Sequence, residues 1–211
     1  MDLTQILTFA GVTALLVMSP GPNGLLIART VPTSGRAAGF ANIAGFVTAF
    51  FVHGTLSILG ISAILMASAS AFTAVKLLGA GYLVWIGLKA LVTAWRGTPA
   101  LPKVEPARRR RNLRRAYVEG FLTNALNPKV SMFYLAAFPQ FLAASHADLL
   151  SAYALVAVHS LINISWFGAM VLTFARLSRL ARGGRFQRWL QGVTGVVFVG
   201  FGLKLASLRH G

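Results

Sequence analysis

Long apolar runs separated by short polar connections dominate this chain. A helix that crosses a bilayer needs about 20 mostly apolar residues. Six runs reach about that length, and every connection between them is short except 96–115, which carries prolines and a run of arginines. The pattern predicts an all-α, polytopic membrane protein with six transmembrane helices, at 3–28, 37–66, 72–95, 116–142, 149–174 and 189–208.

Helix-breaking motifs interrupt the first and fourth runs at matching places, Ser-Pro-Gly-Pro-Asn at 19–23 and Asn-Pro-Lys at 127–129. Pro22 and Pro128 are 106 positions apart (128 − 22), as are His53 and His159 (159 − 53). With three helices in each half, the second half inserts upside down relative to the first, as in transporters built from inverted repeats. We predict a three-helix repeat at 1–95, a basic cytoplasmic linker at 96–115 and a second three-helix repeat at 116–211.

Composition and charge agree with a membrane protein. The chain is 56% hydrophobic and 11% charged, which is too apolar for an ordinary soluble domain. Most of its 20 Lys and Arg residues lie in the connections after the first, third and fifth runs. The positive-inside rule puts these connections in the cytoplasm and both termini outside. The net charge of +16 would also suit a nucleic-acid-binding protein, but its confinement to loops favours topology and contact with anionic lipids over an RNA-binding or regulatory role.

The sequence lacks cysteine and the basic start of a signal peptide. Cysteine is absent, which excludes disulfides and thiolate metal sites. The first residues lack the basic region of a signal peptide, so we expect the first run to be a retained span.

The residues at the two breaks are the main candidates for binding. Proline removes a backbone hydrogen bond, and in hydrocarbon the freed carbonyls must find partners or face a watery cavity. One proline would suggest only a packing kink, but the matched pair favours a substrate site, where Asn23 could cap the second half-helix and receive a carboxylate. The candidate substrate-binding residues are Pro20, Gly21, Pro22, Asn23, Asn124, Asn127, Pro128 and Lys129.

Four titratable side chains inside the apolar runs are candidates for chemistry. Lys129, near mid-depth, could meet the carboxylate of a zwitterionic substrate or carry protons, and its depth argues against extension to the interface. His53, His159 and Glu119 are the proton-coupling candidates. Each histidine could instead be a packing residue, and Glu119 could simply pair with Arg115 one turn back. No acid or cysteine stands beside either histidine, so we predict no metal site.

The motifs resemble those of the LysE/RhtB amino-acid exporters, also called LysE-type translocators, over nearly the whole chain. The matching segments are 19–23, Gly45 to His53 and Gly60, 76–83, 120–124, 127–129 and the Phe-Pro-Gln-Phe sequence at 138–141.

The resemblance implies a secondary transporter of the bacterial inner (plasma) membrane that exports amino acids or close derivatives, with energy from the proton-motive force. It also implies Asn23, Asn127 and Lys129 as site residues. Many relatives carry an acid in the second span, whereas this chain has none between Arg36 and Met66. Proton coupling would then fall to the histidines or Glu119. The expected partners are an amino acid and the lipid bilayer, with no nucleic acid and no cofactor, and glycine-lined helix faces permit a homo-oligomer.

Three other functions fit the sequence less well. Export of a metal or another inorganic ion is disfavoured because the apolar runs offer almost no carboxylates and no cysteine. A membrane-embedded enzyme is disfavoured because neither a His-Glu-x-x-His nor a Gly-x-Ser-x-Gly motif is present. A membrane scaffold that transports nothing would have no need of paired broken helices.

Overall fold

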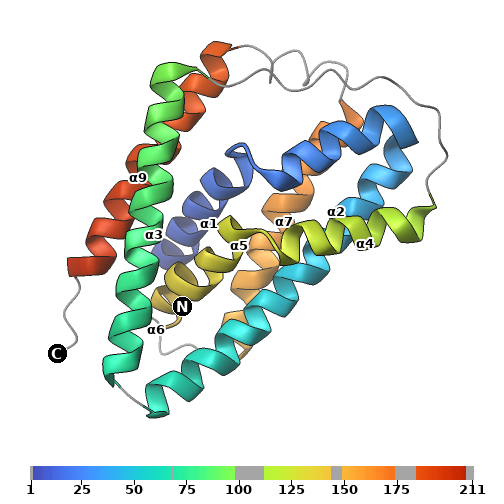
Figure 1. Cartoon of the computed structure of the whole chain (residues 1–211). Helices are drawn as coiled ribbons and strands as arrows, with labels where there is room; N and C mark the ends of the chain where they lie inside the picture. Colours follow the sequence, from blue (N-terminus) through green and yellow to red (C-terminus); the bar gives the residue numbers. More distant parts are fainter. Residues whose placement is uncertain (1, 68, 98–111, 144–148, 174–183, 208–211) are drawn as a thin grey trace.

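The computed structural model describes residues 2–67, 69–97, 112–143, 149–173 and 184–207 of the 211-residue chain (Figure 1). Within these residues every regular element is a helix, which confirms the predicted all-α class. The elements are α1 (Leu3–Met18), α2 (Pro22–Ala67), α3 (Ala69–Arg96), α4 (Leu113–Ala125), α5 (Pro128–Met132), the π-helix η1 (Phe133–Ala137), α6 (Phe138–Ala143), α7 (Leu149–Leu172) and α9 (Gly184–Ser207).

Several helical segments have the length and composition to cross a bilayer. Three do so clearly: Pro22–Gly60, Leu77–Arg96 and Leu149–Leu172. Leu3–Met18 and Gln191–Leu203 are shorter apolar helices. The breaks divide the first and fourth predicted helices into pieces shorter than a full span. The chain is therefore a polytopic membrane protein.

The junction between the first two predicted helices differs from the expected connection at 29–36. Helical geometry continues through this stretch within α2 and is interrupted at Gly35, whose φ is 85° and ψ is 174°. Glycine adopts this left-handed φ without the steric cost that other residues meet. A sharp bend at one glycine thus replaces a loop, and the following part of α2 packs as a separate arm (Figure 1).

Glycine seams hold two pairs of helices close together. Along the antiparallel pair α3 and α9, a Cβ added at Gly87 would lie 2.8 Å from the Gly195 carbonyl oxygen, and one at Gly202 would lie 2.8 Å from that of Ala80. Between α2 and α4, a Cβ at Gly45 would lie 3.0 Å from the Gly120 carbonyl carbon. Such close approach is typical of small residues at membrane helix interfaces.

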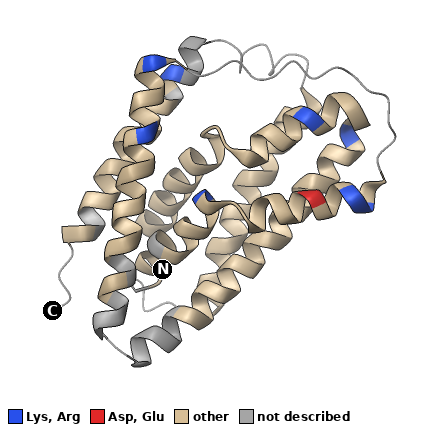
Figure 2. Ribbon diagram, in the orientation of Figure 1, with Lys and Arg blue, Asp and Glu red and all other residues tan. Residues whose placement is uncertain are grey.

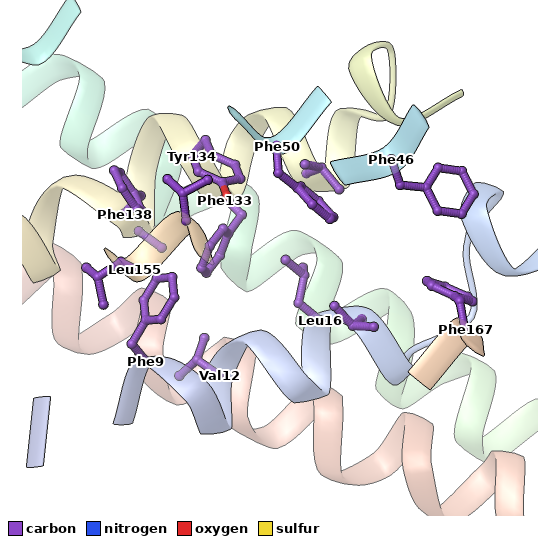
Figure 3. Packing of buried hydrophobic residues seen from close by; sticks show 14 of the residues in the cluster. Phe9, Val12, Leu16, Phe46, Phe50, Phe133, Tyr134, Phe138, Leu155 and Phe167 are labelled. Carbon is purple, nitrogen blue, oxygen red and sulfur yellow. The ribbon is translucent and has the colours of Figure 1, made fainter. Parts of the chain in front are cut away.

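Aromatic rings fill the centre of the bundle on both sides of Leu16 (Figure 3). On one side, the Phe9 ring lies 5.9 Å from Phe133, 6.1 Å from Phe138 and 5.1 Å from Phe141. We call these four residues and Tyr134 the aromatic plug. On the other side, Phe46 of α2 and Phe167 of α7 meet edge to face, with ring centroids 5.7 Å apart.

Most of the described basic residues gather toward one end of the bundle, the upper and right-hand part of Figure 2. We call this the basic end. It is where α3 ends with Arg96 and where α4 and α9 begin, and a Cβ at Gly97 would lie 3.0 Å from the Arg188 guanidinium. The plug includes Phe9 near the start of α1 and Phe141 in α6, so it lies away from the basic end along these helices.

The α2–α4 seam gives a test of the packing. Gly120→Ala should destabilise the protein by about 2 kcal/mol or more, because the added methyl would lie 2.7 Å from the Asn42 Cα, which is backbone and cannot move aside. Thermal unfolding of the detergent-solubilised protein, followed by size-exclusion chromatography, measures the loss. The matched control is Gly81→Ala on α3, where nothing lies within 4 Å. Equal melting temperatures for the two variants would contradict the close approach.

Candidate functional site

The predicted break in the first span is present. α1 ends at Met18, and Ser19 has an extended backbone with φ −65° and ψ 140°. The Ser19 amide still donates to the Leu15 carbonyl at 3.0 Å. α2 begins at Pro22, and the Gly21 carbonyl accepts from the Leu25 amide at 3.1 Å. The interruption leaves the last carbonyls of α1 without helical partners.

Lys129 supplies those partners from the other half of the chain. Its Nζ donates to the Leu16 carbonyl at 2.8 Å, to the Ser19 carbonyl at 3.0 Å and to the Ser19 hydroxyl at 2.8 Å. An ammonium has three donors, so all are engaged. The charge also sits at the negative end of the α1 dipole. A Cβ at Gly21 would lie 3.1 Å from this Nζ, so the glycine leaves room for the ammonium.

The second break is also where the sequence placed it. α4 ends at Ala125 and α5 begins at Pro128, with Asn127 as its N-cap: the Asn127 Oδ1 accepts from the Lys129 amide at 3.1 Å. Near the end of α4, the Asn124 carbonyl lies 3.4 Å from His53 Nε2. An imidazole therefore lies at this second break, whereas a lysine ammonium binds the carbonyls at the first break.

Three buried asparagines link the two breaks. Asn23 Nδ2 donates to Asn124 Oδ1 at 2.9 Å, Asn127 Nδ2 donates to Asn23 Oδ1 at 3.5 Å, and Asn124 Nδ2 donates to the Phe46 carbonyl at 2.8 Å. Asn23 is the second residue of α2 and its side chain bonds across to the other break. The expectation that it caps the second half-helix was therefore wrong, because both polar atoms of its amide bond to asparagines of the other half.

Both predicted histidines contact one tyrosine that sequence reasoning missed. The Tyr134 ring stacks with His53 at 5.7 Å and with His159 at 5.6 Å between centroids. Its hydroxyl lies 3.2 Å from His159 Nδ1. Tyr134 belongs to the π-helix η1, and π-helical turns often occur at functional sites. The sequence signal was weak, consisting only of Pro139 soon after the turn.

Glu119 has a structural partner. Its Oε1 accepts from Arg115 Nε at 3.2 Å, one helical turn away on α4. Arg115 is exposed, and Glu119 lines neither of the cavities described next. This arrangement is the ion pair that the sequence offered as the alternative to proton relay.

Two cavities meet at Lys129. A small cavity of about 20 Å³ lies among α1, α2, α5 and α7, with room for about one water. His159 Nε2 and Asn163 Oδ1, in residues that line it, are buried without hydrogen-bond partners among the described residues. The small cavity is lined by Leu16, Val17, Ser19, Gly21, Asn23, Gly24, Phe50, Asn127, Lys129, Val130, His159, Asn163 and Phe167.

A large pocket of about 260 Å³ lies between the two breaks and the α3–α9 pair. Ser19, Gly21, Asn127 and Lys129 line both cavities. The large pocket is lined by Ser19, Pro20, Gly21, Pro22, Tyr82, Trp85, Ile86, Lys89, Ala90, Thr93, Asn127, Pro128, Lys129, Gln191 and Thr194.

The structure thus brings most predicted site residues together. All of the substrate-binding candidates except Asn23 and Asn124 line the large pocket, Asn23 lines the small cavity, and Asn124 binds Asn23 behind it. The sequence analysis did not predict that residues of α3 and α9 line the large pocket. A signal existed, because Tyr82, Trp85, Lys89 and Thr93 recur at helical spacing on one face of α3.

Comparison with known proteins agrees with this architecture. A family model described as LysE type translocator matches residues 14–209. The chain is 28% identical to the "Uncharacterized membrane protein YrhP" of Bacillus subtilis, covering 95% of this chain and 97% of that one. It is 28% identical to the threonine efflux protein of Escherichia coli K12, covering 98% and 100% of the two chains.

It is also 26% identical to the homoserine/homoserine lactone efflux protein of Salmonella typhimurium, over 94% of each chain. No solved structure matches this chain. The family is one of transporters and not of enzymes. Since the family model covers nearly the whole chain, including both breaks, this protein belongs to the LysE-type translocator family.

Proposed function

We propose that this protein is a secondary transporter of the bacterial inner membrane that exports amino acids or close derivatives. The observation that carries the proposal is the binding of Lys129 to the carbonyl end of α1, beside a pocket of amino-acid size. The efflux names of two relatives, threonine and homoserine, support amino acids over inorganic ions as the cargo.

The site has the two charges that a zwitterion needs. The carbonyl end of α1 is negative, whereas Lys129 and the amino-terminal ends of α2 and α5 are positive. We infer that substrate exchanges with the internal contact. The substrate ammonium takes the Leu16 and Ser19 carbonyls, and its carboxylate takes the Lys129 ammonium that those carbonyls release. Each polar group then keeps a partner throughout, as hydrocarbon requires.

The helix contacts support two inverted three-helix repeats within six spans, with boundaries at 1–95 and 116–211 around the 96–115 linker. In this arrangement α1 corresponds to α4 and the η1 region, α2 to α7, and α3 to α9. The α2–α4 contact then corresponds to the α7–α1 contact, and the α3–η1 contact corresponds to the α9–α1 contact. All four contacts are present. The contacts α3–α9 and α2–α7 convert into themselves. Repeat-built transporters move one such unit against another around a central site.

The conformation is best interpreted as open toward the cytoplasm. The large pocket is lined by Lys89 and Thr93, within two helical turns of Arg96, and by Gln191, just after Arg188. Its lining therefore extends toward the basic end, which the positive-inside rule puts in the cytoplasm. The aromatic plug packs α1 against η1 and α6 away from the basic end, and we infer that it closes the pocket on that side. Export would require the plug rings to separate while the breaks close on the pocket.

Proton coupling is the further part of this proposal. His53 and His159 are joined through Tyr134, and His159 lines the small cavity with Lys129. A single water in that cavity could bridge the unpartnered His159 Nε2 toward the lysine. With that water, His159 and the Tyr134 hydroxyl would form a hydrogen-bonded route for a proton between Lys129 and the plug, whereas His53 contacts Tyr134 by ring stacking. Glu119, paired on the surface of α4, is not part of it.

The proposed orientation can be checked with single cysteines, because the unsubstituted chain has none. Thr4→Cys, at the exposed start of α1, should react with a membrane-impermeant maleimide in spheroplasts. Arg96→Cys, at the exposed end of α3, should react only after permeabilisation. The chain without cysteine is the control for background labelling. The reverse pattern would place the basic end outside and the large pocket toward the periplasm.

The exchange at Lys129 predicts an unusual effect of Ser19→Ala. This substitution removes one of the three acceptors of the Lys129 ammonium, so a substrate displaces the remaining contacts more easily. KM for the exported amino acid should therefore fall about threefold, which corresponds to part of the ~1 kcal/mol that a hydrogen bond contributes. Initial efflux rates from loaded proteoliposomes measure KM. Thr13→Ala is the matched control, because it removes a hydroxyl bonded to the Phe9 carbonyl in the same helix, away from both cavities. An unchanged or higher KM in Ser19→Ala would leave Lys129 a purely structural cap.

Export itself is tested in cells that lack their own exporters and are fed dipeptides. The protein should accelerate release of particular free amino acids, and an uncoupler should abolish the acceleration. Lys129→Met should lower the rate at least about tenfold, since a partly buried, charged hydrogen-bond donor is lost. Arg96→Met, at the exposed end of α3, removes the same charge and should not. If the protein is present in the membrane but accelerates the release of no amino acid, the proposed cargo is refuted.

A further inference from the structure

We propose that the large pocket selects amino acids by charge, and that Lys89 at its cytoplasmic side excludes those with cationic side chains. This inference rests on the proposed function and names the class of substrate for the same site: amino acids with neutral polar or acidic side chains. Neither Lys89 nor any other residue of α3 was among the sequence-predicted site residues.

The charge balance of the pocket is the first argument. Two lysines, Lys89 and Lys129, line it, and no acidic residue is among its lining. Of the acids in the described part of the chain, Asp2 caps α1 at its first turn and Glu119 pairs with Arg115. Once a substrate carboxylate has met Lys129 and its ammonium has met the α1 carbonyls, the zwitterion is balanced. Lys89 then remains as an excess positive charge.

The position of Lys89 is the second argument. It is exposed, lies on the same face of α3 as Trp85, and its Nζ is 5.2 Å from the centre of the Trp85 ring. A cation over an indole face is attracted electrostatically, so this contact favours positions of the ammonium beside the pocket. Lys89 lies seven residues before Arg96, between the site and the basic end of the bundle. A substrate entering from that end passes it.

The neutral polar groups are the third argument. Gln191 and Thr194 of α9 are 8% and 1% exposed and line the pocket. The Thr194 hydroxyl has no hydrogen-bond partner among the described residues. A buried hydroxyl without a partner is costly, and a hydroxyl or amide on a substrate side chain would satisfy it. A cationic side chain would find a hydroxyl and an amide here but no carboxylate to balance its charge.

The magnitude follows from the charges. Two like charges in one partly hydrated pocket repel enough to lower occupancy on the order of tenfold. An acidic side chain would meet Lys89 favourably, whereas a neutral one would be indifferent to it. The same reasoning predicts that reversing the charge of Lys89 reverses the preference.

The test compares neutral and cationic amino acids in the same cells. Cells are fed dipeptides of threonine and of lysine together, and the ratio of lysine to threonine efflux is measured, so that differences in protein amount cancel. The wild-type protein should release threonine and little lysine. Lys89→Glu should raise the ratio on the order of tenfold or more, and Lys89→Gln should give an intermediate value.

Arg96→Glu is the matched control, because it makes the same charge reversal on the same helix outside the pocket lining. Its ratio should equal that of the wild type. Wild-type export of lysine as fast as threonine would overturn the charge selection and leave the proposed function intact. An equal rise in Arg96→Glu and Lys89→Glu would show a general surface effect and overturn the role of Lys89. Failure of the wild type to release any amino acid would overturn both proposals.

Discussion

A helix broken inside a membrane leaves backbone carbonyls that no lipid can satisfy, and the ammonium of Lys129 meets that need at the end of α1. The contact joins residues more than a hundred positions apart and fixes the two breaks against each other. The buried asparagine chain does the same for the amide groups around it. The polar centre of the bundle is therefore a set of mutually satisfied groups with a pocket beside it.

The two breaks are alike in sequence position but not in chemistry. The end of α4 is approached by His53, an imidazole, whereas the end of α1 is held by a lysine that could equally bind a carboxylate. This asymmetry gives the proposed transporter one polar site in place of two equivalent ones. It also places the exchangeable contact at the junction of both cavities, where a small displacement of the ammonium changes what each cavity offers.

Packing elsewhere determines what that site can reach. The glycine seam between α3 and α9 allows their backbones to approach closely. The pair forms one side of the large pocket, where Trp85, Lys89 and Thr194 lie opposite the breaks. On the opposite side, aromatic rings from α1, η1 and α6 fill the space between helices. Dense packing on one side and a pocket on the other give the molecule a direction. This is the asymmetry that a transporter must be able to reverse.

The sequence by itself determined the helical class and the places of both breaks, and it offered the Glu119–Arg115 pair as the alternative to a proton-coupling role for Glu119. These depend on local chemistry: proline lacks an amide hydrogen, apolar runs of this length suit a bilayer, and charges four apart share a helix face. Only the tertiary structure decided that Asn23 bonds to Asn124, that Tyr134 joins both histidines, and that α3 and α9 complete the pocket. Those contacts join distant segments, and their geometry depends on how closely the glycine seams let the helices approach, which no local pattern specifies.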